Sequence, residues 1–492
     1  MKKNYFLGAA AAFGLFAFSS CSSDNDPISK PELMTGDQVI VLDMQDTDVL
    51  STKSRPLYST SNKGAEQVTD VQLLVFGYNS TSKQYEYVKR LTAISNWNNT
   101  SADYSYGRKK ELKLTGNDKL AKTDPETGNY SKYIILAVGQ DESDTNAIPA
   151  PFKIELGAAA DADKFVKELA DGSWTANTPW NVASSAGNGF LKTADVDYNT
   201  TPAGEIFSGV STPIEFTADG GFSTTVLLKR QVAGVMGYFS RIPSKVDGNI
   251  VTGIRLVSAV KNKAVDLSVV LEKQKDDTTH ELPGDKTLEK VVNGFNAIAN
   301  GNGDAEFKNK TKAHTVYKID LKDWFKWDDA EGGKWHNDAL ITTEDGTELL
   351  GNVKGWHNAL DASNSANVTV ADGAVFAGNF VIPFANNKSV NAENNTFELQ
   401  LINETTTGGN TTVNVLKAWD VKLDPQSQGE GDGDKVYSVY RNHLYQIGKR
   451  GSGDTPTNPG VDPDKPQPLD KDQELIIKIN DQWEFIHDME IE

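Results

Sequence analysis

The C-terminal end of the chain alternates between apolar and polar side chains with a period of two residues. The apolar positions of this pattern are Leu475, Ile477, Ile479, Trp483, Phe485, Met489 and Ile491. Such alternation is typical of a β-strand that buries one face. An isolated strand, or a ribbon of two, is only marginally stable in water, so residues 473–492 must join a sheet.

A segment of low hydrophobicity separates this end from the rest of the chain. Residues 450–472 are rich in Gly, Pro, Asp and Lys, cannot bury enough surface to fold alone, and should form an extended linker. The C-terminal strands can therefore fold back onto their own domain, or enter a groove of a second copy, as in donor-strand complementation. A head-to-tail contact of the second kind builds a filament if it does not close.

A second strand of interest lies near the N-terminus. Residues 37–44 are rich in β-branched side chains, and their apolar members are Val39, Ile40, Val41, Leu42 and Met44. The polar segment that follows contains two basic cleavage positions, Lys53 and Arg55. The strand is either an ordinary edge strand with a long loop, or a plug that protects a groove until cleavage releases it. In the uncut chain we expect this strand to be paired in the first domain and the C-terminal segment to be free or loosely docked.

The N-terminus has the pattern of a lipoprotein signal peptide. A short basic leader precedes an apolar core that ends just before Cys21, the one cysteine of the chain. We expect Cys21 to be lipidated and the protein to be held at a membrane by this lipid; a free buried thiol is the alternative reading. A single cysteine excludes disulfides within the chain and multi-cysteine metal sites.

Composition narrows the class further. A net charge of -19 argues against nucleic acid as a partner, because such binding needs a basic face. Short apolar alternations recur between turn-like clusters rich in Gly and Asn, which predicts an all-β protein with two β-sandwich domains and few short helices. The expected divisions are 1–20 (signal peptide), 21–55 (propeptide with the removable strand), 56–272 and 273–449 (the two domains), 450–472 (linker) and 473–492 (donor strands).

Within the domains the pattern predicts individual elements. The expected strands are 68–76, 85–91, 111–114, 133–138, 226–239, 251–260, 376–384, 396–402, 412–423 and 436–447. Glycines inside 226–239 indicate a bulge or a close backbone approach. Residues 161–169 and 289–299 are the expected helices.

Several segments resemble the Bacteroidales fimbrillin family of type V pilins, the FimA and Mfa kinds of major fimbrial subunit. They are the lipobox ending at Cys21, residues 68–76, residues 203–209 (Ala-Gly-Glu-Ile-Phe-Ser-Gly), residues 228–235 (Leu-Lys-Arg-Gln-Val-Ala-Gly-Val) and residues 439–447 (Val-Tyr-Arg-Asn-His-Leu-Tyr-Gln-Ile). The last two are the most specific, and the matches span nearly the whole chain in the family's order. The separate C-terminal strand pair is most similar to the Mfa kind.

The resemblance implies a fold and a life cycle. It implies two transthyretin-like domains, transport to the outer membrane as a palmitate-bearing lipoprotein precursor, and then a place in a cell-surface fimbria that supports adhesion. It implies head-to-tail association with other copies and accessory pilins after a protease removes the N-terminal strand, and no cofactor. Arg55 matches the family's cleavage arginine. One departure is Pro56, which hinders most trypsin-like proteases and leaves Lys53 or Lys63 as alternative sites.

Signs of catalysis are sparse. The sequence has six scattered histidines and no nucleophile, zinc-protease or phosphate-loop motif. Trp335-His336-Asn337 and Trp356-His357-Asn358 form a short echo that could bind metal or glycan, although a repeated packing motif accounts for it as well. His443 is read as a hydrogen-bonded structural residue. No metal, cofactor or catalytic residue is therefore expected, and the protein is not expected to be an enzyme.

Three functional classes remain. The chain is a structural pilus subunit, a monomeric surface lipoprotein that binds glycan or host protein, or a secreted hydrolase whose two carboxylates lie on separate loops.

Overall fold

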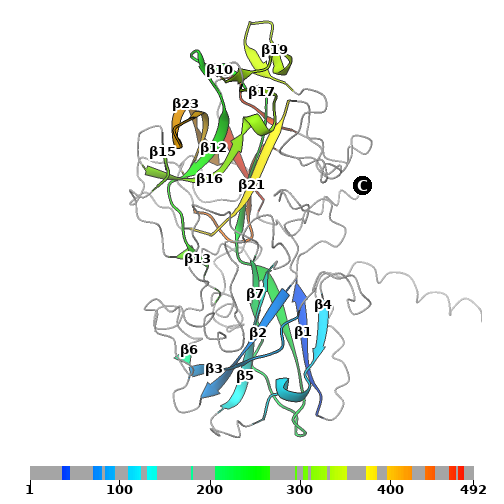
Figure 1. Ribbon diagram of the computed structural model, residues 1–492. Helices are drawn as coiled ribbons and strands as arrows, with labels where there is room; N and C mark the ends of the chain where they lie inside the picture. Colours follow the sequence, from blue (N-terminus) through cyan, green and yellow to red (C-terminus); the bar gives the residue numbers. More distant parts are fainter. Residues whose placement is uncertain are drawn as a thin grey trace, which may run out of the picture.

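The computed structural model describes residues 36–44, 70–79, 84–94, 109–122, 130–140, 179–180, 206–265, 267, 294–295, 303–307, 312–329, 333–351, 373–384, 396–423, 438–448, 465–471 and 475–480. These residues form an all-β protein of β-sandwich type, as the sequence predicts. In Figure 1 a first sheet occupies the lower half of the molecule and a second sheet the upper half.

The first sheet has the strand order β4-β1-β8-β7-β5-β2-β3-β6. Its strands are β1 (Gln38–Met44), β2 (Asp70–Asn79), β3 (Gln84–Arg90), β4 (Lys109–Lys113), β5 (Tyr130–Gln140), β6 (Pro179–Trp180), β7 (Ile206–Val210) and β8 (Phe222–Arg230). Side chains of β1 and β8 share one buried cluster with side chains of β2 and β5, so the sheet folds over on itself. This arrangement makes the lower sandwich.

The second sheet has the order β15-β16-β12-β22-β23-β26-β24-β9-β21, with β25 beside β9. Its strands are β9 (Ala233–Ser240), β12 (Gly253–Ser258), β15 (Ala305–Glu306), β16 (Lys312–Asp320), β21 (Val375–Val381), β22 (Phe397–Thr407), β23 (Asn410–Leu423), β24 (Leu444–Ile447), β25 (Gln467–Pro468) and β26 (Leu475–Asn480). The Nδ2 of Asn379 on β21 donates to the Val316 carbonyl of β16 at 2.8 Å, so the sheet curls until strands near its two ends touch.

Short two-stranded ribbons lie outside the two large sheets. They are β10 (Lys245–Val246) with β11 (Asn249–Ile250), β13 (Ala264–Val265) with β14 (Gly294–Phe295), β17 (Trp327–Asp328) with β18 (Lys334–Trp335), and β19 (Leu340–Thr342) with β20 (Glu348–Leu350). The 3-10 turns η1 (Gly116–Asp118), η3 (Leu321–Asp323) and η4 (Asn337–Ala339) complete the described elements.

The long strand predicted over 226–239 is two strands. It breaks at Gln231–Val232, where the chain leaves the first sheet as β8 and enters the second as β9. Strands β9 and β12 therefore belong to the second sheet, although the sequence places them in the first domain. The predicted boundary at 272–273 does not coincide with the change of sheet.

Most other predicted strands are present with ends shifted by a few residues, and β2 pairs antiparallel with β3. The strand predicted over 436–447 is an exception, because only Leu444–Ile447 forms a strand (β24) and a turn at Arg441–Asn442 precedes it. The helix predicted over 289–299 is wrong where it can be checked, because Gly294–Phe295 forms β14. The helix predicted over 161–169 lies outside the described residues.

Gly209 on β7 is required by a close approach of backbones. A Cβ added there would lie 1.8 Å from the carbonyl oxygen of Leu227 on β8. We expect Gly209→Ala to lower the free energy of unfolding by about 3 kcal/mol or more in urea denaturation, because backbone cannot move aside. The control is Gly116→Ala, at φ +54° with no atom within 4 Å, which should cost only about 1–2 kcal/mol of backbone strain. Equal losses would contradict the prediction.

Candidate strand-exchange site

Strand β1 lies inside the first sheet. It pairs antiparallel with β4, where Val41 faces Glu111, and parallel with β8, where Val41 faces Thr225. Figure 1 shows β1 beside β4 at one side of the lower sandwich. An N-terminal strand with partners on both sides fills a slot in the sheet, which corrects the edge-strand alternative and agrees with the expectation that it is paired in the uncut chain.

The apolar side chains of β1 are buried on both of its faces. Ile40 and Leu42 are 0% exposed and belong to the core of the first sandwich, and Val39 and Val41 are 4% and 3% exposed. A fully buried aliphatic side chain contributes about 1.5–3 kcal/mol. Removal of β1 would therefore leave a slot between β4 and β8 whose core-facing positions, those of the alternate residues Ile40 and Leu42, need apolar side chains from any strand that replaces it.

The N-terminal end of β1 is fastened by polar contacts. The buried amide of Gln38 donates to the carbonyls of Leu120 (2.7 Å) and Gly220 (3.0 Å), and its Oε1 accepts from the Leu120 N–H. Lys113 on β4 forms a 2.6 Å ion pair with Asp37. These contacts set the register of the strand and have to break if the strand leaves.

The structure does not describe the residues predicted to be lipidated or cleaved before β1 leaves. Cys21, Lys53, Arg55 and Lys63 lie outside the described residues, as does the side chain of Met44. Their roles remain predictions from the sequence.

Strand β26 holds the first part of the predicted donor segment. Its beginning pairs parallel with the end of β23, where Val421 faces Leu475, and its end pairs antiparallel with β24, where Tyr445 faces Ile479. Leu475 and Ile477 are 0% exposed in the core of the second sandwich. The expectation of a free or loosely docked C-terminal segment is therefore wrong for 475–480, because this stretch completes the chain's own sheet. Trp483, Phe485, Met489 and Ile491 lie outside the described residues.

The last part of the predicted linker is also docked. Strand β25 pairs parallel with β9, and Leu469 is fully buried in the same core as Leu475. Asp470 forms a 2.6 Å ion pair with Arg241. The buried Leu469, the pairing of β25 with β9 and the Asp470 ion pair together attach the end of a segment whose composition predicts an extended linker.

The two most specific sequence motifs meet at the junction between the sheets. Residues 228–235 contain the β8–β9 crossing, and residues 439–447 lead into β24, which pairs parallel with β9. Arg441, 1% exposed, donates through Nη1 to the Gln231 side chain at 3.0 Å. The Asn442 N–H donates to the Val232 carbonyl, and the Gly234 N–H to the His443 carbonyl. Sequence reasoning recognised both motifs but did not find that they bind each other.

Asn442 combines a left-handed backbone conformation with a side-chain hydrogen bond at this junction. Its φ of +56° is left-handed, and its Oδ1 accepts from Nη1 of the buried Arg230 at 3.1 Å. We expect Asn442→Gly to lower the free energy of unfolding by about 1–3 kcal/mol through the lost acceptor for a charged donor. Asn442→Ala should cost about 1–2 kcal/mol more, because alanine adds left-handed strain. Denaturant titration of the three proteins measures both, and equal values for Gly and Ala would refute the strain assignment.

Side chains that suggested catalysis have structural roles. His443 is buried and its Nδ1 lies 2.6 Å from the Arg441 carbonyl, as expected of a structural residue. Trp335 packs edge-on against Trp327 and donates to the Val251 carbonyl, while His336 caps η4. The matching Trp356-His357-Asn358 lies outside the described residues. Within the described ranges no three His, Cys, Asp or Glu side chains are placed to hold a metal ion, and no helix there could cross a membrane.

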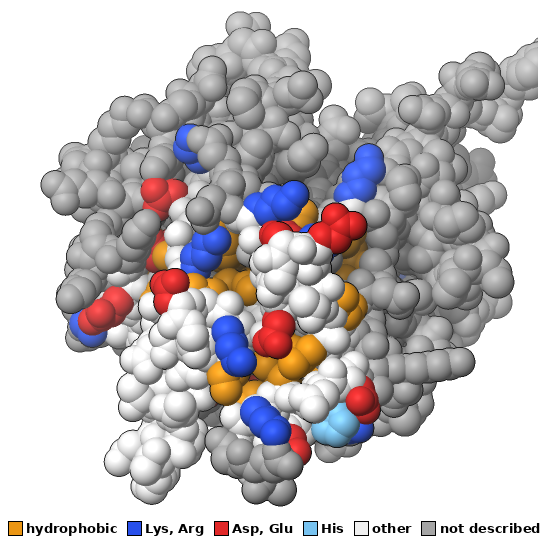
Figure 2. All heavy atoms as spheres, turned by 90° about the horizontal axis from the view of Figure 1, so that it is seen from above, with side chains coloured by type: hydrophobic (Ala, Val, Ile, Leu, Met, Phe, Trp, Pro, Cys, Tyr) orange, Lys and Arg blue, Asp and Glu red, His pale blue; other side chains and the backbone are white. Residues whose placement is uncertain are grey.

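The charges on the upper face are mixed. Figure 2 views the molecule from above, and its basic and acidic side chains are interspersed around patches of apolar ones. The visible described surface has no field of a single sign.

The fold defines the class as an all-β protein with two sandwiches, each completed by a strand from one end of the chain. No family model matches the sequence, and no curated protein matches it. Solved structures that this chain matches include a candidate adhesin from Bacteroides thetaiotaomicron (10% identity, 92% of this chain and 98% of that one, TM-score 0.34). Others are a fimbrial assembly protein from Parabacteroides distasonis (11%, 85% and 93%, 0.28) and the fimbrial anchor protein Mfa2 from Porphyromonas gingivalis (8%, 64% and 72%, 0.23). These structure neighbours are thus described as adhesins and fimbrial proteins of Bacteroidales. We infer a function from the positions of this chain's own strands.

Proposed function

We propose that the protein is a structural subunit of a surface fimbria that polymerises by strand exchange and supports adhesion. The observation that carries the proposal is the position of β1. It is a terminal strand that fills an interior slot, with Ile40 and Leu42 fully buried, and it is joined to the rest of the chain by a segment with basic residues. Cleavage after Lys53 or Arg55 would cut the covalent link and leave β1 held only by non-covalent contacts.

The incoming strand in this proposal is residues 481–492 of a second copy. Trp483, Phe485, Met489 and Ile491 share one face of an alternating segment and suit an apolar slot. Strand β26 connects this donor segment to the rest of the chain, and we call it the root of the donor. It stays in its own subunit, because withdrawal of Leu475 and Ile477 would leave a gap in the core of the second sandwich. The segment that enters a second copy is therefore residues 481–492 and not the whole of residues 473–492.

The membrane stage of the proposal rests on the leader. Lipid on Cys21 would hold the precursor at the outer membrane, and removal of residues up to the cleavage site would free the subunit together with β1. The partners are other copies and accessory pilins, head to tail, and the processing protease.

Limited trypsin digestion of the purified chain tests the proposal. Cleavage between 45 and 69 should produce ladders in gels of unboiled samples and fibres in electron micrographs. Mass spectrometry of the cut protein identifies the bond used, which also decides whether Pro56 protects Arg55. A protein that is cut there, releases β1 and remains a monomer at high concentration would refute the pilus proposal and favour a monomeric binding protein.

A further inference from the structure

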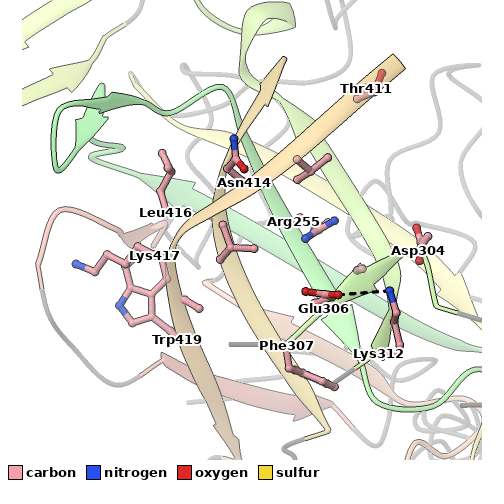
Figure 3. A pocket seen from close by; sticks show the side chains of 14 residues that line it. Arg255, Asp304, Glu306, Phe307, Lys312, Thr411, Asn414, Leu416, Lys417 and Trp419 are labelled. Carbon is pink, nitrogen blue, oxygen red and sulfur yellow. Dashed lines mark hydrogen bonds and ion pairs between the residues drawn. The ribbon is translucent and has the colours of Figure 1, made fainter. Parts of the chain in front are cut away.

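A pocket of about 910 Å³ with a partly polar lining lies on the second sheet, whereas β1 belongs to the first sheet. Strand β23 forms one wall, with Thr411 and Asn414, and the β15–β16 edge forms the other, with Asp304, Glu306 and Lys312. Figure 3 shows Arg255 of β12 between these walls. Protein pockets that enclose small ligands measure about 300–1,000 Å³, so this one is large enough for a ligand of several rings.

Arg255 is built into the floor of the pocket. It is 5% exposed, and its Nε and Nη2 both donate to Oε1 of Gln400, at 3.0 and 2.7 Å. Gln400 is held in turn by Glu398, at 2.7 Å. Among the described residues no hydrogen-bond partner faces the remaining nitrogen, Nη1. Because Arg255 lines the pocket, the donors that it does not give to Gln400 can serve a ligand there.

The pocket lining carries charges of both signs, three positive and two negative. Arg255, Lys312 and Lys417 contribute positive charge to the lining, and Asp304 and Glu306 contribute negative charge. Burial lowers the pKa of Arg255, and nearby carboxylates, including Glu398 just outside the lining, oppose this shift. An anionic ligand would meet Asp304 and Glu306, and a cationic one would meet Arg255 and Lys312. The lining suits a neutral molecule that both donates and accepts hydrogen bonds.

We propose that this pocket binds a neutral, hydroxyl-rich ligand of the oligosaccharide class. Sugar hydroxyls can accept from Arg255 Nη1 and Asn414, and can donate to the carboxylates of Asp304 and Glu306. Phe307 and Leu416 add apolar surface to the lining for the carbon face of a ring. None of the residues that line the pocket belongs to β1 or to residues 481–492.

The test uses the full chain on an array of neutral, carboxylated and sulfated oligosaccharides, followed by calorimetry with the strongest neutral binder. Arg255→Lys keeps the charge and loses the guanidinium fork, and should weaken binding at least about tenfold. Asn414→Ala changes an exposed residue of β23, leaves the fold intact, and should weaken binding several-fold. The control is Asn249→Ala on β11, an exposed asparagine that does not line the pocket and should leave affinity unchanged.

Each outcome decides the proposal. Binding of neutral sugars that both pocket variants weaken, with a normal melting temperature, supports it. Binding of charged sugars alone, no binding on the array, or binding that neither variant changes overturns it. If Arg255→Lys does not fold, Asn414→Ala and the control give the answer.

Discussion

A disulfide between β1 and β4 is expected to keep the cleaved chain monomeric until it is reduced. The variant is Val41→Cys with Glu111→Cys, in a Cys21→Ser background that removes the native thiol. The Leu114 N–H donates to the Gln38 carbonyl, which makes that pair hydrogen-bonded and the 41–111 pair a non-hydrogen-bonded one. Cα atoms of such pairs are about 4.5 Å apart, inside the range that a disulfide spans.

The oxidised variant should be cut by trypsin as fast as the parent and yet form no ladders, because β1 stays tied in its slot. Reduction should restore ladders to the level of the parent, a change from none to full assembly. The matched control is Thr406→Cys with Thr411→Cys in the β22–β23 hairpin, where the two hydroxyls lie 3.2 Å apart. This bridge leaves β1 free and should not affect assembly. Ladders from the oxidised β1 variant would show that assembly does not need the slot.

Two truncations should separate the donor from its root. A chain that ends after Asn480 keeps β26, and should lose all assembly while its melting temperature stays within about 2 °C of the parent. A chain that ends after Asp472 also loses Leu475 and Ile477, which are 0% exposed. It should lose assembly and at least about 4 kcal/mol of stability, since emptying a core site costs about 2–5 kcal/mol for each large aliphatic side chain.

A point variant of the full chain provides the control. Leu475→Ala should lower the melting temperature and leave ladders intact, because β26 remains in its own subunit. Ladder formation lost at an unchanged melting temperature would instead identify β26 as part of the exchanged strand. Differential scanning calorimetry and unboiled gels on the same samples give both readings.

Much of the fold could be predicted from local pattern. The β-branched run predicts β1, an apolar run that alternates at its start predicts β2, and repeated short apolar segments predict the all-β class. These features depend on neighbours within a few residues, which is where side-chain periodicity gives its information.

The wrong predictions concern pairings between residues that are far apart in the sequence. The run from Val226 to Phe239 is interrupted only by the three polar residues 229–231, which do not by themselves show that the chain passes there from one sheet into another. Arg441 and Asn442, far along the sequence, hold that turn. Strand β26 was assigned as a donor because its alternation suits any open slot. The choice between its own sheet and a neighbour's depends on β23 and β24, which no short window contains.

The direct passage from β8 to β9 has a mechanical consequence. In a fibre built as proposed, the incoming strand of one neighbour pairs with β8 of a subunit. The same subunit's own donor segment continues from β26. Strand β24 alone lies between β26 and β9 in the second sheet. Tension on the fibre then passes through the backbone at Gln231–Val232 and loads ladders of hydrogen bonds along the strand direction. A ladder pulled in shear must break many bonds at once, whereas one peeled from its end breaks them singly. In such a fibre, the two-residue crossing passes load directly from one sheet to the other.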